Sequence, residues 1–342
     1  MTANRLLLMV IAALLCLLGW LWWPAESAQD GQPTPLFPEL AAHIDAIGRI
    51  EVRGAGSEVL ATLERRDSAW HLLERDWPAH GGRIQRLLQE LGEARRVEAK
   101  TSDATRYARL GVEPVDAEDA AGIELVVIGD GIEFRVVVGD PPASGGGRFV
   151  RVVDQAQAWR VDRELELPRE TAAWLDRRLV DRPLARIERV EVKPASGRAF
   201  TVERVGESFG MDGMPANELA DPYRGDALAG LLDALQLDDV AVDDGSNPVQ
   251  SARFVGVDGF DITIDAWTAG TEVWARCSAQ LDEPRARAWL AQGDAKDEVE
   301  AGLQSLRGEL SPLQGRCAGH AFRLPEYKAR NLMRTREQYL AD

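Results

Sequence analysis

The feature of this sequence that most restricts its possible folds is an internal duplication. The segment IEVRGAGSEVLATLERRDSAWHL begins at Ile50, and the segment VEVKPASGRAFTVERVGESFGM begins at Val190. The two segments align with a single gap, so that Ile50 matches Val190 and Trp70 matches Phe209. Alternating apolar residues separated by Gly and Ser predict strands joined by tight turns, each strand with one buried face. Two copies of one pattern indicate duplicated modules rather than a solenoid.

A helix and a short strand are expected after the strands of each copy. A helix over 83–91, approached through Trp77 and Pro78, would present one apolar stripe, and 228–235 shows the same spacing. The two stripes consist of Ile84, Leu87, Leu88 and Leu91 in the first copy and Leu228, Leu231, Leu232 and Leu235 in the second.

Further helices are expected at 167–184, in the terminal segment from 324, and in an insertion at about 283–310 that only the second copy contains. The predicted fold class is therefore α+β, with antiparallel sheets and packed helices. The first α+β module is expected at 44–183, and the second, related module, with the insertion, at 184–342.

Three glycines, Gly145 to Gly147, precede the stretch RFVRVV and suggest a phosphate site at first sight. A phosphate-binding loop places its glycines between a strand and a helix, whose N-terminal amides face the anion. Here a strand-like stretch follows, and no Lys-Ser or Lys-Thr pair is present after the glycines. The triplet is therefore predicted to be a turn within a four-stranded antiparallel meander.

An uncharged apolar run at 6–23 predicts a transmembrane helix. At about 1.5 Å per residue this run would be roughly 27 Å long, close to the thickness of the bilayer's hydrocarbon layer. The expected membrane-interface residues are Arg5, Trp20, Trp22 and Trp23. The positive-inside rule makes 1–5 a cytoplasmic tail, 24–43 a linker and the rest of the chain extracytoplasmic. A cleaved signal peptide is the alternative, for which PAESAQ would be a poor cleavage site.

The sequence contains three cysteines. Cys16 lies in the expected membrane helix, whereas Cys277 and Cys317 lie in the part expected outside the cytoplasm, both in strand-like sequence. Because an oxidising compartment permits these two to pair, a disulfide between Cys277 and Cys317 is predicted. Two separate buried thiols are the alternative.

No arrangement of residues typical of catalysis or of metal binding is found in the sequence. The four histidines are scattered, and neither HExxH, CxxC nor a G-x-S-x-G elbow occurs. The sequence contains enough acidic residues to include a pair of catalytic carboxylates, but it does not show which residues would form such a pair. We therefore expect no cofactor, metal or catalytic residue. The net charge of −16 disfavours nucleic acid as a partner.

Several motifs occur in a fixed order: LFPEL, IGRIEV, WHL, WPAHGGRIQRLLQEL, KTSDATRYARLGV, VVVGD before GGGRFVRV, and AWRV before WLDRRLV. In this order and spacing the chain resembles domain-of-unknown-function family 4340, over roughly residues 1–205. The insertion departs from the family's pattern. The resemblance implies a single-span bacterial inner-membrane protein with a duplicated extracytoplasmic domain, similar to components that accompany ABC-2-type transporters and gliding-motility auxiliary proteins. It implies no catalytic residue.

The expected function is that of a non-catalytic, membrane-anchored periplasmic accessory or scaffold subunit of an ABC-2-type transport complex. Its expected partners are the membrane and the transporter subunits, and the oligomeric state stays open. One alternative is a periplasmic binding module for envelope glycan or a small ligand. Another is a carboxylate-dependent hydrolase.

Overall fold

The structure, a computed structural model, describes residues 33–292 and 298–340. The expected cytoplasmic tail and transmembrane helix, with Arg5, Trp20, Trp22 and Trp23, lie outside the described residues, as does the first part of the linker. Within the described ranges, no helix has both the length and the apolar character needed to cross a bilayer. The described chain is α+β and consists mainly of antiparallel strands with a smaller number of helices.

The chain divides into two compact units. The first contains the described residues up to Leu60 together with Ile84–Leu167, and the second contains Ala61–Arg83 and the residues from Pro168 onward. The expected boundary at 183 therefore differs from the structural one in two ways. The second unit begins at Pro168, and it also includes part of the first repeat.

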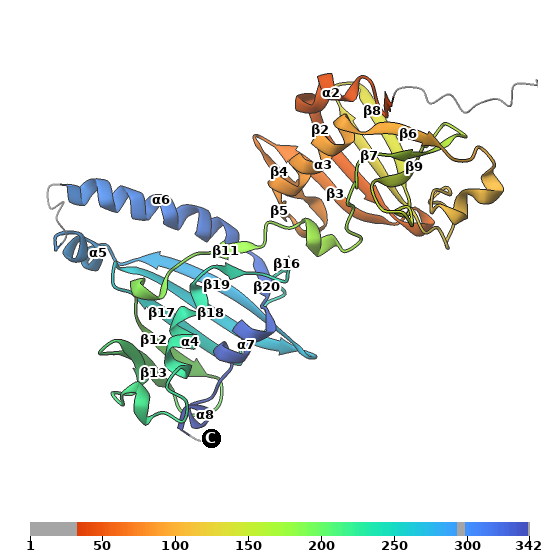
Figure 1. Ribbon diagram of the computed structural model, residues 1–342. Coiled ribbons are helices and arrows are strands. Elements are labelled where there is room, and N and C mark those ends of the chain that lie inside the picture. The colour runs from red at the N-terminus through yellow and green to blue at the C-terminus, as the bar shows by residue number, and fades with distance from the viewer. Residues whose placement is uncertain (1–32, 293–297, 341–342) are drawn as a thin grey trace, which may run out of the picture. The chain divides into compact units, whose positions relative to one another are not determined.

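The first unit is an antiparallel sheet with one long helix packed against it (Figure 1). The helix α3 (Gly81–Glu93) buries all four residues of the predicted stripe, because their spacing places them on one helical face. Strands β7 to β10 form the predicted meander. The elements are β1 (Thr34–Pro35), α2 (Leu40–His43), β2 (Ile47–Arg53), β6 (Arg95–Ala99), β7 (Ile123–Gly129), β8 (Ile132–Val138), β9 (Arg148–Val152) and β10 (Ala158–Val161).

The glycine triplet lies in the connection between β8 and β9, as the strand-like sequence after it predicts. All three glycines have positive φ, and Gly147 has a φ of 89°. A Cβ atom at Gly147 would lie 1.8 Å from the carbonyl oxygen of Val161 on the neighbouring strand. The last glycine is thus required by a close backbone approach as well as by the turn.

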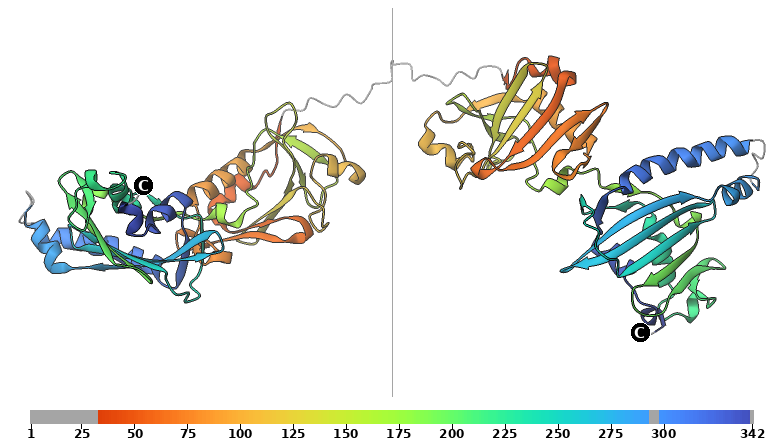
Figure 2. Two further views of the ribbon diagram at one scale, coloured as in Figure 1. Left: turned by 90° about the horizontal axis from the view of Figure 1, so that it is seen from below. Right: turned by 180° about the vertical axis from the view of Figure 1, so that it is seen from behind.

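The second unit is built on an eight-stranded antiparallel sheet, which Figure 2 shows from behind. Its helices α4 (Arg224–Ala229) and α7 (Glu326–Leu332) contact each other, and α6 (Val299–Cys317) lies along β19. The other elements are β11 (Arg178–Val180), β12 (Ile187–Pro194), β13 (Phe200–Val205), β14 (Ser208–Met211), β15 (Leu235–Gln236), β16 (Asp239–Val242), β17 (Gln250–Gly256), β18 (Phe260–Ala269), β19 (Glu272–Leu281), α5 (Glu283–Leu290), β20 (His320–Arg323) and α8 (Glu337–Leu340).

Most of the segment from β3 (Val59–Arg66) through β4 (Ala69–Leu72) to β5 (Trp77–Pro78) also belongs to the second unit. Trp77 is 1% exposed, and its ring lies 5.2 Å from that of His320 and 5.5 Å from that of Phe322. Its Nε1 donates a hydrogen bond of 2.9 Å to the carbonyl of Asp176. Trp77 is therefore a core residue of the second unit rather than only the approach to the first helix.

The two repeats share one strand order. The sheet of the first repeat runs β1-β6-β10-β9-β8-β7-β2-β3-β4-β5, and that of the second runs β16-β20-β19-β18-β17-β12-β13-β14. When β1 and β5 are left out, each order contains eight strands, and the strands at the same position in the two orders correspond to each other in the duplication. The register agrees as well, since Arg65 lies opposite Trp70 and Arg204 lies opposite Phe209. Residues that the sequence alignment matches thus occupy equivalent positions in the two sheets.

Three expected helices differ from those in the structure. The segment 167–184 contains only a 3₁₀ turn, Thr171–Trp174, and the strand β11, because its backbone pairs with Ala79 and with β15. The terminal segment forms two short helices, α7 and α8, rather than one.

The helix of the second repeat is the third of these. After α4 the chain forms a 3₁₀ turn, Gly230–Leu232, and Leu235 lies in β15. The buried ammonium of Lys328 donates hydrogen bonds to the backbone carbonyls of Gly230, Leu231 and Asp233. These carbonyls are then satisfied outside the helix, so the helix ends there. All four leucines of the expected stripe are nevertheless buried.

Candidate functional site

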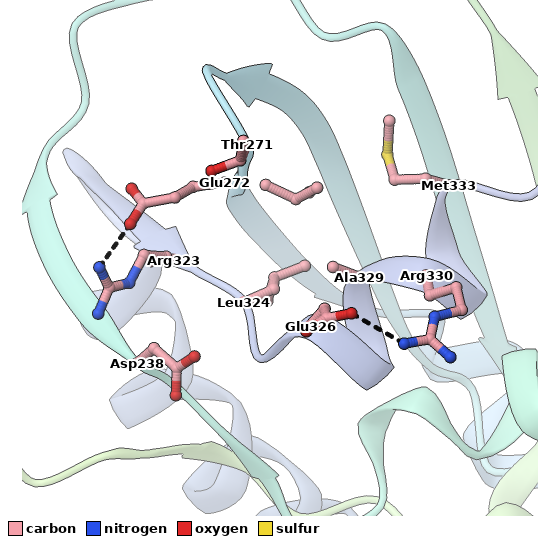
Figure 3. Close-up of a pocket in the computed structure, with 10 residues that line it drawn as sticks. Asp238, Thr271, Glu272, Arg323, Leu324, Glu326, Ala329, Arg330 and Met333 are labelled. Atoms are coloured by element: carbon pink, nitrogen blue, oxygen red, sulfur yellow. Dashed lines mark hydrogen bonds and ion pairs between the residues drawn. The ribbon is translucent and has the colours of Figure 1, made fainter.

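A well-defined cavity lies in the second unit, between the tip of the β18–β19 hairpin and α7 (Figure 3). It has a volume of about 580 Å³, within the range typical of small-molecule pockets. Its walls come from the hairpin, from the end of β20, from α7 and from the residue before β16. The lining residues are Asp238, Thr271, Glu272, Val273, Arg323, Leu324, Glu326, Ala329, Arg330 and Met333.

The floor of the cavity is apolar and its two sides are charged. Leu324 and Ala329 are 4% and 5% exposed, and Figure 3 shows them between two ion pairs. On one side Glu272 accepts a hydrogen bond of 2.7 Å from Arg323, and on the other Glu326 accepts one of 2.9 Å from Arg330. The sequence places the second pair four residues apart on α7, where side chains meet on one helical face.

In both ion pairs the glutamate side chain is more exposed than the arginine side chain. Glu272 is 43% exposed against 32% for Arg323, and Glu326 is 90% exposed against 66% for Arg330. Exposed pairs of this kind contribute only about 0–1 kcal/mol, so either partner is available to a ligand at little cost. The lining contains three carboxylates, of Asp238, Glu272 and Glu326, against two guanidiniums, so the cavity presents net negative charge.

The position of α7 is set by a buried lysine. Lys328 is 8% exposed, and its Nζ donates to three backbone carbonyls at the end of the α4 region, at 2.8 to 3.0 Å. Burial lowers the pKa of Lys328, and the nearby charge of Asp233 opposes that shift. On the opposite side of the cavity, Leu324 donates a backbone hydrogen bond to Val273, which joins the floor to the hairpin. Both walls are thus held by backbone contacts.

The structure brings Cys277 and Cys317 together in a disulfide, with their Cα atoms 5.1 Å apart. Cys277 lies in β19, as its sequence indicates, but Cys317 is the last residue of α6 and not part of a strand. The expected helical insertion is longer than 283–310, since α6 continues to Cys317. The disulfide therefore closes the segment that contains α5 and α6.

A second cavity of about 280 Å³ lies beside β11 and α6. Its charged wall contains Arg182, which is 6% exposed, contacts the carboxylate of Asp258 and lies 4.5 Å from the ring centre of Phe260. Asp258 is fully buried and accepts a second contact, of 2.8 Å, from Arg186. Arg182 also contacts Glu309 at 3.0 Å, so two arginines face two carboxylates. Because these charges compensate one another, we interpret the cluster as structural.

Sequence reasoning did not locate the larger cavity. The only signal for it was the Leu-Pro-Glu stretch at 324–326, which marks a helix start but says nothing about the hairpin that faces it. The lining residues include neither a histidine nor a cysteine, and the described part of the chain contains no group of three or more His, Cys, Asp or Glu side chains placed to hold a metal ion. The chemistry that this arrangement supports is binding through apolar contact and charge.

Comparison with known proteins identifies a family but no individual relative. A search of curated proteins and a search of solved structures each gave no significant match. The model of the family described as Domain of unknown function (DUF4340) matches residues 70–252, which is more than half of the chain. This protein therefore belongs to the DUF4340 family.

Proposed function

We propose that the protein is a non-catalytic, membrane-anchored accessory subunit of an ABC-2-type transport complex, with both described units on the extracytoplasmic side of the inner membrane. The observation that supports this location best is the disulfide between Cys277 and Cys317. Disulfides persist in oxidising compartments such as the periplasm and are rare in the reducing cytosol. The apolar run at 6–23 supplies the anchor in this proposal.

The proposed association with a transporter rests on the family resemblance, which implies that the protein accompanies an ABC-2-type transporter. The net charge of −16 adds a physical preference, because it favours a partner surface that carries lysine and arginine.

Affinity purification of the full chain in mild detergent tests the assembly. We expect ABC-transporter subunits to be recovered with the tagged chain, and recovery of the chain alone under conditions that preserve such complexes would refute the assembly. Topology has its own test, because alkaline phosphatase fused after the last residue is active only outside the cytoplasm. An inactive fusion, with a cytoplasmic reporter active at the same site, would refute the location.

A second candidate function is a periplasmic binding module. The cavity between the β18–β19 hairpin and α7 favours it, since its volume and its mixture of apolar floor and charged walls suit a ligand of several residues or rings. The two functions are compatible, because an accessory subunit can contact its partner through such a cavity.

A further inference from the structure

We infer that the cavity between the β18–β19 hairpin and α7 binds a peptide segment of a partner protein, in which one apolar side chain stands next to a lysine or arginine. This assignment deepens the proposed accessory function and rests on it for the nature of the partner. It rests on the cavity itself for the chemistry of the ligand.

The apolar part of the ligand follows from the floor of the cavity. Val273, Leu324, Ala329 and Met333 present methyl and thioether groups, and none of the described lining residues is aromatic. A floor of this kind surrounds a branched aliphatic side chain, whereas it offers no flat ring on which a sugar could stack. Met333 adds an adaptable surface, because the unbranched thioether changes shape at little cost.

The cationic part follows from the walls. Glu272 and Glu326 are each more exposed than the arginine they contact, so a cation at the mouth meets carboxylate first. The two carboxylates stand on opposite sides of the floor in Figure 3, which places a charged group on either side of a bound apolar residue. The chain's net charge of −16 attracts the same cation at longer range.

The peptide backbone accounts for the remaining polar groups. Each wall combines a carboxylate, which accepts hydrogen bonds, with a guanidinium, which has more donors than its one contact to that carboxylate uses. A peptide presents N–H donors and C=O acceptors in alternation and so matches both. A purely hydrocarbon ligand would make no use of these groups.

Methionine-methyl NMR of the full chain in mild detergent provides a local test. Met333 lines the cavity, whereas Met211 is fully buried in β14, the strand at the opposite edge of the eight-stranded sheet from β16. The probe is acetyl-Lys-Leu-Lys-amide. We expect it to shift the Met333 methyl resonance in a saturable manner and to leave that of Met211 unchanged.

Three comparison probes test the ligand class. Replacing the central Leu by Ser should weaken binding about tenfold, because the buried apolar surface is lost. Acetyl-Glu-Leu-Glu-amide should bind more weakly than the lysine probe. Equal shifts from all three peptides, or no shift at about 10 mM, would overturn the assignment. A shift of Met333 by an N-acetylglucosamine disaccharide but not by the peptides would overturn it in favour of a glycan.

Variants test the walls. Glu272→Gln and Glu326→Gln should each weaken binding of the lysine probe about two- to fivefold, which is the range of affinity that an exposed charge contact contributes. Glu326→Lys should reverse the preference toward the glutamate probe. The control is Glu207→Gln, which removes an exposed carboxylate at the β13–β14 turn and should change nothing. Unchanged affinity in both cavity variants would overturn the role of the carboxylates.

The outcomes separate this inference from the proposed function. A selective Met333 response without recovery of transporter subunits would refute the assembly and retain the peptide site. Recovery of transporter subunits by a chain whose Met333 resonance never responds would refute the peptide site and retain the assembly.

Discussion

Cys277 and Cys317 join the middle of β19 to the last residue of α6 through a disulfide. The disulfide attaches the C-terminal end of the insertion of the second repeat to the sheet. The two cysteines are 40 residues apart, and both side chains are almost completely buried. The insertion is therefore fastened to the sheet at its base.

Loss of this disulfide should destabilise the second unit. In the chain-entropy model a closed loop of this length contributes about 4 kcal/mol, so Cys277→Ser with Cys317→Ser should lower the free energy of unfolding by about 2–4 kcal/mol. Urea unfolding followed by circular dichroism measures the change. Reductant should destabilise the wild-type chain similarly and leave the double variant unaffected, and an equal effect of reductant on both chains would contradict the prediction.

Replacement of Trp77 should lower the stability of the second unit, although this residue belongs to the first repeat by sequence. Trp77→Ala removes a fully buried ring that packs on His320 and Phe322, and we expect a loss of about 3–5 kcal/mol. Trp77→Phe retains most of the packing but lacks the hydrogen bond to Asp176, so its loss should be smaller. Denaturant titration of the two variants tests this order, and equal stabilities would show that Trp77 is not a core residue.

Two neighbouring glycines provide a matched comparison of backbone strain and close contact. Gly146 and Gly147 have φ values of 75° and 89°, but only at Gly147 would a Cβ meet another group, the carbonyl of Val161. Gly146→Ala should cost about 1 kcal/mol from strain alone. Gly147→Ala should cost clearly more and lower the melting temperature further. If the two variants melt together, the contact with Val161 does not restrict this turn.

Tyr339 should make stability depend on pH in the alkaline range. Burial raises the pKa of Tyr339 to about 12, against an ordinary value of 10.0, and its ring lies 5.4 Å from that of Phe200. Because the folded pKa is the higher one, the contribution is complete below pH 10 and is lost as the pH rises toward about 12. The loss would be about 2–3 kcal/mol.

The control for this prediction is Tyr339→Phe, which has no phenol to ionise. Free energies of unfolding measured from pH 9 to 12 should fall more steeply in the wild-type chain than in this variant. Parallel curves would mean that Tyr339 ionises without penalty in the folded protein.

Local periodicity was sufficient for much of the fold. The stripe on α3, the meander from β7 to β10 and the turn at Gly147 follow from the residue pattern, because strands and helices bury residues at their own fixed spacings. Pairing of Cys277 with Cys317 could be proposed because few cysteines occur in the chain. The position of Cys317 at the end of a helix could not be predicted, because a short apolar run is compatible with a strand as well as with a helix.

The tertiary structure alone decided the rest. The stretch at 167–184 has a helical pattern but becomes a 3₁₀ turn and a strand, because Ala79 and β15 offer its backbone partners from distant parts of the chain. Lys328 ends the helix of the second repeat from almost a hundred residues away. The cavity likewise joins the β18–β19 hairpin to α7, and its apolar floor and charged walls exist only once these segments meet. The sequence by itself determined the duplication and its alternating strands, because these depend on near neighbours, whereas contacts between distant segments depend on how the whole unit packs.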